Sequence, residues 1–410
     1  MNPGNLSNPS ARLRPKLTKA FRIVSLTVVV LLGGLVALFW NDHLAFFRGK
    51  AILTSEVMVL EDCDSDFRNP PFEDAVIMIR ADRNYVSKLK DLSICETVGG
   101  CKSLAVAQDG RFFTVCENVG NKVSAYDLST GKQLWTVKGE SVSAQDFSST
   151  TISPNGTVYA LASQNGTIYG DYALVIDEQG RVTKQASVGG FDLTLDPERS
   201  VVWLVGKDIK KCDLELKVLL EVNPIKWCGV SVDLDRDGGV WVAERQHPDV
   251  AQSTNRIFKL SSNGEILKSV GLTFTPFCVR VDRSNGSIWV TGVAGNKSPT
   301  HRLLDSIEKH TGRLPTGKWL RDLLQHPIVR YKTQKYDTNG ALHCEIPRGG
   351  FSLDIDQADG SLWVAGQRKI FLFSREGKPL AQFKAESCND KYVVVIPRSD
   401  YQGKAHKMAK

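Results

Sequence analysis

The chain has 410 residues, of which 42% are hydrophobic and 24% are charged, so it can bury a large core and is neither disordered nor collagen-like. Its formal net charge of +7 comes from residues 1–22, 294–340 and 401–410, which carry five, five and three positive charges in excess. The rest of the chain is therefore net negative, at about −6. A basic groove along a phosphate backbone is not supported, and we do not expect a nucleic-acid partner.

The N-terminal residues predict a membrane anchor. Five basic residues in segment 1–22 precede an uncharged apolar run, residues 23–40, which is close to the length that a helix needs to span a membrane. Unbalanced positive charge before the run favours a cytoplasmic N-terminus, with the remainder periplasmic or extracellular. A cleaved signal peptide is the alternative, but the run ends in bulky Phe39 and Trp40, which favours an uncleaved single-pass anchor. We expect residues 41–73 to form a linker.

Internal repeats fill the rest of the chain and predict an all-β fold. Four segments combine an apolar strand, an acidic turn and a strand with Trp, and they begin at Phe191, Cys228, Phe277 and Phe351. The acid-to-Trp pairs are Asp196 with Trp203, Asp233 with Trp241, Asp282 with Trp289 and Asp356 with Trp363. Looser repeats begin at Ser103 and Thr150. Four antiparallel strands in each of six units are typical of a β-propeller, which we place at residues 74–400.

The two ends of this region predict how the ring closes. Residues 391–397 form an apolar strand pattern, and residues 75–80, 84–89 and 92–97 form three more. Pairing across the ends would cover an exposed strand edge by building a composite blade. We therefore predict seven blades in preference to six.

These hairpins resemble those of NHL-repeat and virginiamycin B lyase-like propellers over residues 100–385. One segment, which begins at Ser124, is similar instead to pyrroloquinoline-quinone-type repeats, and this implies that Gly131 and Trp135 dock one blade against the next. The resemblance implies an architecture and no single activity, because propellers host binding, scaffolding, hydrolysis and lyase chemistry on one frame.

One turn matches the spacing of a calcium-binding loop. Asp233, Asp235, Asp237 and Gly238 are followed by Glu244, which fits the pattern D-x-D-x-D-G-x5-E. Calcium or another divalent metal is one interpretation. A solvated, Asp-rich hairpin is the other, because the flanks are predicted strands and not the helices that such a loop normally joins.

Two residues that follow the Trp241 strand are catalytic candidates. Glu244 and His247 have side chains that can act as general acid and base. Charged residues on a surface loop are the alternative, since the matching positions elsewhere are Gly206, Gly292 and Gly366. We find no nucleophile elbow, phosphate-binding loop, C-x-x-C pair or metal-spaced His cluster in the sequence.

A long insertion, residues 294–340, interrupts one repeat. Two short amphipathic helices are predicted there, with Leu304, Trp319, Arg321 and Leu323 as candidate interaction residues. Their apolar faces could pack on the propeller, or they could dock a partner or the membrane surface. A basic tail, residues 401–410, ends the chain.

The sequence thus predicts a membrane-anchored extracytoplasmic propeller that binds a protein or polymer. A metal-dependent lyase or lactone hydrolase of the propeller type is the alternative. Carboxylates, Asn or His converging on the channel mouth from several blades would favour the enzyme, whereas an apolar or aromatic rim would favour binding.

Overall fold

The computed structural model describes eleven stretches of the chain. They are residues 55–62, 75–82, 85–93, 101–117, 121–165, 170–225, 228–246, 254–294, 330–366, 369–384 and 389–397. All of them belong to the unit Lys50–Lys410, one of two into which the chain divides. The predicted anchor at 23–40 and the basic tail at 401–410 lie outside the described residues, as does most of the insertion. Within the stretches above, no helix is long and apolar enough to cross a membrane.

Six antiparallel sheets each consist of four consecutive strands, so each sheet corresponds to one repeat of the sequence. The first three sheets are β4 (Cys101–Val106), β5 (Phe112–Glu117), β6 (Lys122–Asp127), β7 (Gln133–Lys138); β8 (Asp146–Ile152), β9 (Val158–Ser163), β10 (Tyr172–Ile176), β11 (Val182–Ala186); and β12 (Asp192–Asp196), β13 (Val201–Val205), β14 (Ile209–Asp213), β15 (Val218–Val222). A 3-10 turn, Gly139–Val142, joins the first of these sheets to the second.

The next three sheets follow the same plan. They are β16 (Cys228–Leu234), β17 (Val240–Arg245), β18 (Arg256–Leu260), β19 (Ile266–Gly271); β20 (Thr275–Asp282), β21 (Ser287–Ala294), β22 (Arg330–Tyr336), β23 (Leu342–Ile346); and β24 (Ser352–Ile355), β25 (Leu362–Gly366), β26 (Lys369–Phe373), β27 (Pro379–Lys384). The insertion leaves after β21 and returns at β22, so it joins the second and third strands of its sheet.

A composite sheet joins the two ends of the described chain. Its order is β28 (Asn389–Val395), β1 (Ser55–Asp62), β2 (Ala75–Asp82) and β3 (Tyr85–Ser93). This corrects the sequence interpretation at one strand. β1 lies inside the predicted linker 41–73, and it takes the place in the sheet for which residues 92–97 were predicted; residues 92 and 93 belong to β3, and 94–97 lie outside the described residues. Six blades are single repeats, and the composite sheet completes the set of seven four-stranded sheets.

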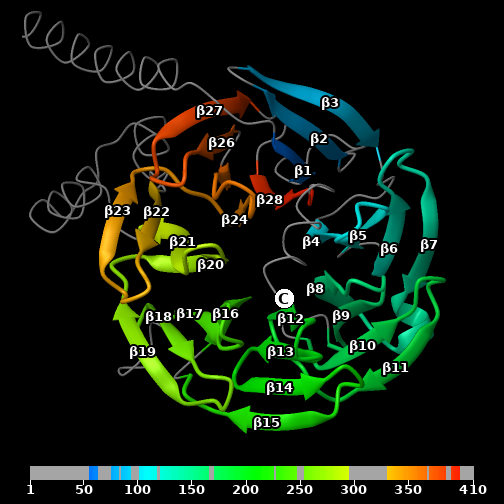
Figure 1. The fold of residues 1–410 in the computed structure, drawn as a ribbon. Helices are drawn as coiled ribbons and strands as arrows, with labels where there is room; N and C mark the ends of the chain where they lie inside the picture. The colour runs from blue at the N-terminus through cyan, green and yellow to red at the C-terminus, as the bar shows by residue number, and fades with distance from the viewer. Residues whose placement is uncertain are drawn as a thin grey trace, which may run out of the picture. The chain divides into compact units, whose positions relative to one another are not determined.

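The sheets succeed one another around a ring (Figure 1). Each innermost strand contacts the innermost strand of the next sheet, in the order β4, β8, β12, β16, β20, β24, β28 and back to β4. Sheets that extend outward from such a ring form a β-propeller. The fold class is therefore the one that the repeats predict.

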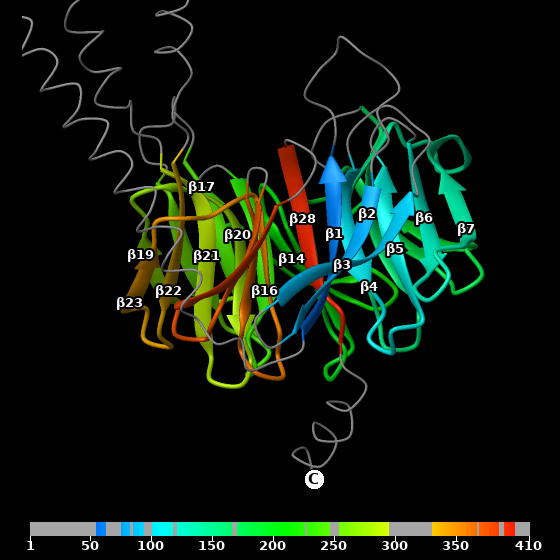
Figure 2. The same cartoon turned by 90° about the horizontal axis from the view of Figure 1, so that it is seen from above.

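The two faces of the propeller differ in their connections (Figure 2). The turn face carries the links from first to second and from third to fourth strand, which are tight turns. The loop face holds the strand ends that are connected by the links from second to third strand and from one sheet to the next, including the end of β21 and the start of β22. Because strands alternate in direction, β1 begins and β28 ends at the turn face.

The four repeated tryptophans are buried in their sheets at the same strand position. Trp203, Trp241, Trp289 and Trp363 lie on second strands and are at most 1% exposed. Each pairs across the sheet with a residue of the innermost strand, as Trp241 does with Asp233. The periodic Trp therefore marks the packing of one repeat on the next, which is what its regular spacing predicted.

Turns between third and fourth strands dock on the preceding sheet. Gly180 has a φ of +79° and packs against Trp135, so close that a Cβ would lie 2.6 Å from that side chain. The docking role implied for Trp135 is thus seen in the structure. Three lysine ammonium groups donate a hydrogen bond to a backbone carbonyl in the corresponding turn of the following sheet. These bonds are Lys211 to Ser262 at 3.0 Å, Lys268 to Thr338 at 3.0 Å and Lys335 to Arg375 at 2.5 Å.

Candidate functional site

The centre of the ring is lined by side chains that link neighbouring innermost strands. An innermost strand has one edge without a strand partner, so its N–H groups on that edge need other acceptors. Ser103 Oγ accepts the N–H of Thr150 at 3.1 Å, and Ser231 Oγ accepts that of Val279 at 3.2 Å. Asp192 and Ser352 accept the N–H groups of Val232 and Val393 in the same way, whereas the Cys278 thiol donates to the carbonyl of Leu353 at 3.6 Å. Each of these residues stands four positions before the residue at which the turn after the innermost strand begins. Those turn residues are Ala107, Asp196, Asp235, Asp282 and Asp356.

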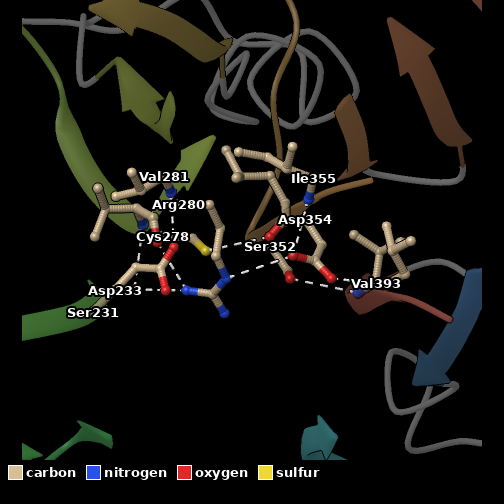
Figure 3. Close-up of polar contacts among 12 residues, drawn as sticks. Ser231, Asp233, Cys278, Arg280, Val281, Ser352, Asp354, Ile355 and Val393 are labelled. Atoms are coloured by element: carbon tan, nitrogen blue, oxygen red, sulfur yellow. Dashed lines mark hydrogen bonds and ion pairs between the residues drawn. The ribbon is translucent and has the colours of Figure 1, made fainter. Parts of the chain in front are cut away.

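Two aspartates make a second level of links, two residues closer to the turn face (Figure 3). Asp233 Oδ2 accepts the N–H of Val281 at 2.7 Å, and Asp354 Oδ2 accepts that of Val395 at 2.8 Å. In both, Oδ1 accepts the N–H of the following residue at 2.9 Å. Both oxygens of each carboxylate are therefore engaged by backbone donors.

Arg280 occupies this level in the sheet between those two aspartates (Figure 3). Its Nη1 donates to the carbonyl of Val279 at 2.8 Å, and its Nε lies 3.9 Å from Asp354 Oδ1. Burial raises the pKa of Asp354 to about 6, although Arg280 and two backbone N–H groups act in the opposite direction. Burial likewise raises the pKa of the Cys278 thiol, which keeps it in the protonated, weakly nucleophilic form.

The loop-face mouth of the ring has a different chemical character. In four innermost strands a single residue is bulged out of the strand pairing at the loop-face end: Lys102, Ser148, Val230 and Phe277. Phe191 and Phe351 hold the same position, just before β12 and β24. A bulge breaks the alternation of a strand and redirects a side chain. Phe191, Val230, Phe277 and Phe351 are half-buried, and we call these four residues the bulge rim.

Aromatic and cationic contacts join the rim across three sheets. The rings of Phe277 and Phe351 have centroids 5.0 Å apart, and Tyr331 meets Phe351 edge-on at 5.4 Å. The Arg245 guanidinium lies over the Phe277 ring, 5.1 Å from its centroid. Such stacking holds a guanidinium in place while leaving its donors directed outward.

Glycine pairs position two rim residues. Phe191 follows Gly189 and Gly190, and Phe351 follows Gly349 and Gly350. A Cβ on Gly350 would lie 1.5 Å from the carbonyl oxygen of Ala365, so no larger residue fits beside the second strand there. The rim residues are not among the site residues predicted from the sequence, although the repeated G-G-F segment marks two of them.

The structure separates the predicted calcium ligands. Asp235 and Asp237 lie in the turn and contact the ammonium of Lys259 at 2.7 and 2.5 Å, while Asp233 links two sheets. Glu244 lies at the other end of β17 and pairs with Arg256, Oε2 to Nε, at 2.5 Å. Four residues of strand, roughly 13 Å, separate it from the turn. Among the described stretches no group of three or more His, Cys, Asp or Glu could hold a metal ion.

The remaining candidates are less informative. Glu244 is fully buried in its ion pair with Arg256, which does not suit an acid or base that must meet a substrate. Its proposed partner His247 lies outside the described residues, as do Leu304, Trp319, Arg321 and Leu323 of the insertion.

Comparison with known proteins supports the fold alone. No family model matches the chain, and no curated protein matches it. A chain in the crystal structure of the mitotic checkpoint complex aligns with a TM-score of 0.52 and 12% identity, over 77% of this chain and 86% of that one. Hydrazine synthase of Kuenenia stuttgartiensis aligns with a TM-score of 0.50 and 15% identity, over 77% and 92%. The fold is a β-propeller. At these identities the similarity carries no activity and no partner to this chain.

Proposed function

We propose that this chain is a membrane-anchored extracytoplasmic β-propeller that acts as a protein- or polymer-binding module. The observation that carries the proposal is the bulge rim, because an apolar and aromatic mouth favours binding over chemistry. A propeller is a rigid frame suited to protein binding or scaffolding, and its loops are free to vary around that frame.

The metal-dependent enzyme receives less support from the site. Its ligands would have to be carboxylates that converge on the channel, and Asp233 and Asp354 do lie there. However, their oxygens already accept backbone N–H groups from two sheets, so they serve as links between blades. Ligation by either aspartate would break or weaken such a link.

Membrane anchoring and outward orientation rest on the sequence. The uncharged run at 23–40 and the five basic residues before it support the anchor and the N-in topology. The NHL-repeat and virginiamycin B lyase-like resemblance is likewise a proposal from the hairpin motifs, and it is compatible with a binding role.

Site-specific photo-crosslinking tests the binding role. A photoreactive amino acid replaces exposed Gln246 at the loop face or exposed Asn263 at the turn face of the full chain in its native membrane. We expect discrete adducts from position 246 and none from 263. The absence of adducts from both positions, in a chain that is folded and membrane-bound, would contradict a binding function.

Protease treatment of intact cells tests the topology separately. We expect the propeller to be accessible from outside, and the chain to remain in the membrane after alkaline extraction. Release of the chain by alkali, or protection of the propeller, would reject the anchor or its orientation without bearing on the crosslinking result.

A further inference from the structure

The charge around the bulge rim is unevenly distributed. Among the side chains that the structure describes at the loop-face ends of the three sheets from β16 to β27, five are basic and two are acidic. The basic residues are Arg245, Arg256, Lys332, Arg348 and Lys369, and the acidic ones are Glu244 and Glu345. Both acids are already paired, Glu244 with Arg256 and Glu345 with Lys332 at 3.0 Å. Positive charge is therefore in excess beside the aromatic contacts.

Arg245 is the basic residue that best connects this charge to the rim. It lies over Phe277, and in the described part of the chain its guanidinium contacts no acidic side chain. A planar guanidinium held on an aromatic ring can accept a carboxylate in a two-point contact. Arg245 thus offers a fixed cationic position next to an apolar surface.

The opposite face lacks this excess of positive charge. The six turns of the same three sheets, residues 235–239, 261–265, 282–286, 337–341, 356–360 and 374–378, hold eight acidic and four basic side chains. Four further ammonium groups reach into these turns, those of Lys211, Lys259, Lys268 and Lys335, so the charges there balance. An acidic ligand would therefore be attracted to the loop face in preference to the turn face. In addition, β1 begins and β28 ends on the turn face, so neither end strand leads into the loop-face mouth.

We infer that the bulge rim, with Arg245 and Tyr331, docks an acidic segment of a partner protein that inserts an apolar side chain between carboxylates. The inference rests on the proposed binding function and specifies the chemistry of its partner. The apolar side chain would pack on Phe277 and Phe351, and a carboxylate beside it would pair with Arg245. Aromatic and arginine residues at the centre of a contact surface commonly supply most of the binding energy.

Fluorescence anisotropy with defined peptides tests this chemistry on the full chain in detergent. The probe is a labelled peptide of glutamates interrupted by two phenylalanines. Matched controls replace every glutamate by lysine, or both phenylalanines by alanine. We expect the acidic aromatic peptide to bind, each control peptide to bind roughly tenfold more weakly or worse, and added salt to weaken binding.

Variants locate the contact. Arg245→Ala should weaken binding of the probe roughly tenfold or more, and Arg245→Glu should shift preference toward the lysine peptide. Arg236→Ala, at an exposed turn-face arginine, is the matched control and should leave the affinity unchanged. Circular dichroism melts of all three variants establish that they fold.

Several outcomes would overturn the inference. Equal affinity of Arg245→Ala and the parent chain would remove the site, as would equal binding of the glutamate and lysine peptides. Binding of a sulfated polysaccharide in place of the peptide would assign the face to a polymer. Loop-face crosslinks without peptide binding would reject the acidic partner while leaving the binding function intact, whereas loss of both would reject the two together.

Discussion

The aspartates on the innermost strands serve the fold because of where their backbone neighbours lie. Asp192, Asp233 and Asp354 each accept an N–H from the next sheet, at 3.1, 2.7 and 2.8 Å. An unpaired buried N–H costs about 1–3 kcal/mol, so these acceptors replace the strand partner that an inner edge lacks. As a consequence, these carboxylates are held where water solvates them poorly, which disfavours their ionised form, most clearly at Asp354.

Asp354→Asn should change the pH dependence of stability. With a folded pKa near 6 and an ordinary value of 3.8, Asp354 favours the native state at low pH, and this contribution is lost as the pH rises through 6. The variant should therefore gain stability relative to the parent between pH 4 and pH 7, by at most about 3 kcal/mol. Urea unfolding at several pH values measures the difference.

Asp127 provides the control for that titration. Hydrogen bonds from Ser129 and Thr130 lower its pKa to about 2, so it stays ionised across the range. Asp127→Asn should shift stability by a constant amount from pH 5 to pH 7. A pH-independent difference for Asp354→Asn as well would contradict the raised pKa.

Calcium should not stabilise the propeller through the Asp233 turn. Asp235 and Asp237 share the ammonium group of Lys259, and Glu244 is remote and paired with Arg256. Because a ligand raises stability only when it binds the folded state preferentially, we expect the same unfolding temperature with calcium and with chelator. A rise in calcium that disappears in Asp235→Ala would restore the metal site.

At the scale of elements, a bulge at the loop-face end of the innermost strand recurs in four sheets and shapes the mouth of the ring. Strand pairing alone would alternate side chains between the two neighbouring sheets, burying all of them. A bulge at the loop-face end of the innermost strand interrupts this, and Phe277 contacts the sheets on both sides as a result. The G-G-F segment achieves the same placement where no bulge is present, with the Gly350 backbone close against β25.

Gly350→Ala should disrupt both the rim and the fold. A Cβ there would overlap the carbonyl of Ala365, so either β24 or β25 must shift, and we expect a loss of at least about 2 kcal/mol. Gly271→Ala is the matched control, since nothing lies within 4 Å of its Cβ position. Chemical unfolding of both variants measures the difference; similar stabilities would mean that the backbone accommodates the added methyl group.

At the scale of the whole propeller, stability depends on closure by β28. This strand pairs with β1, supplies N–H groups to Ser352 and Asp354, and contacts β4 on its other side. It therefore connects the composite sheet to both neighbours along the inner ring. A missing closing strand would expose an edge and an apolar face on each side of the gap.

Removing residues 389–410 should destabilise the entire propeller. Val393, Val395 and Ile396 are at least 91% buried, and their loss alone removes about 5 kcal/mol of apolar burial. We expect a lower denaturant midpoint and a broader transition than for the full chain. The control removes only 401–410 and should unfold like the parent; unchanged cooperativity after the longer deletion would show that closure is dispensable.

The repeats predicted the fold because a propeller is built from near-identical local units. Four of the six units combine an apolar strand, an acidic turn and a Trp strand, and Trp203, Trp241, Trp289 and Trp363 are buried as their spacing indicated. The candidate sites were predicted less well. The calcium pattern of Asp233 to Glu244 is a match along the chain, and an extended strand places its members at opposite ends of a sheet.

The sequence by itself determined the number of repeats, the alternation within each strand and the turns, because these depend on neighbours within a few residues. Only the tertiary structure decided which strands close the ring, which carboxylates link sheets and which residues form the rim. Those outcomes depend on contacts between residues that are far apart in the chain, such as Asp354 with Val395 and Arg245 with Phe277. Local patterns carry no information about these contacts until the ring brings the sheets together.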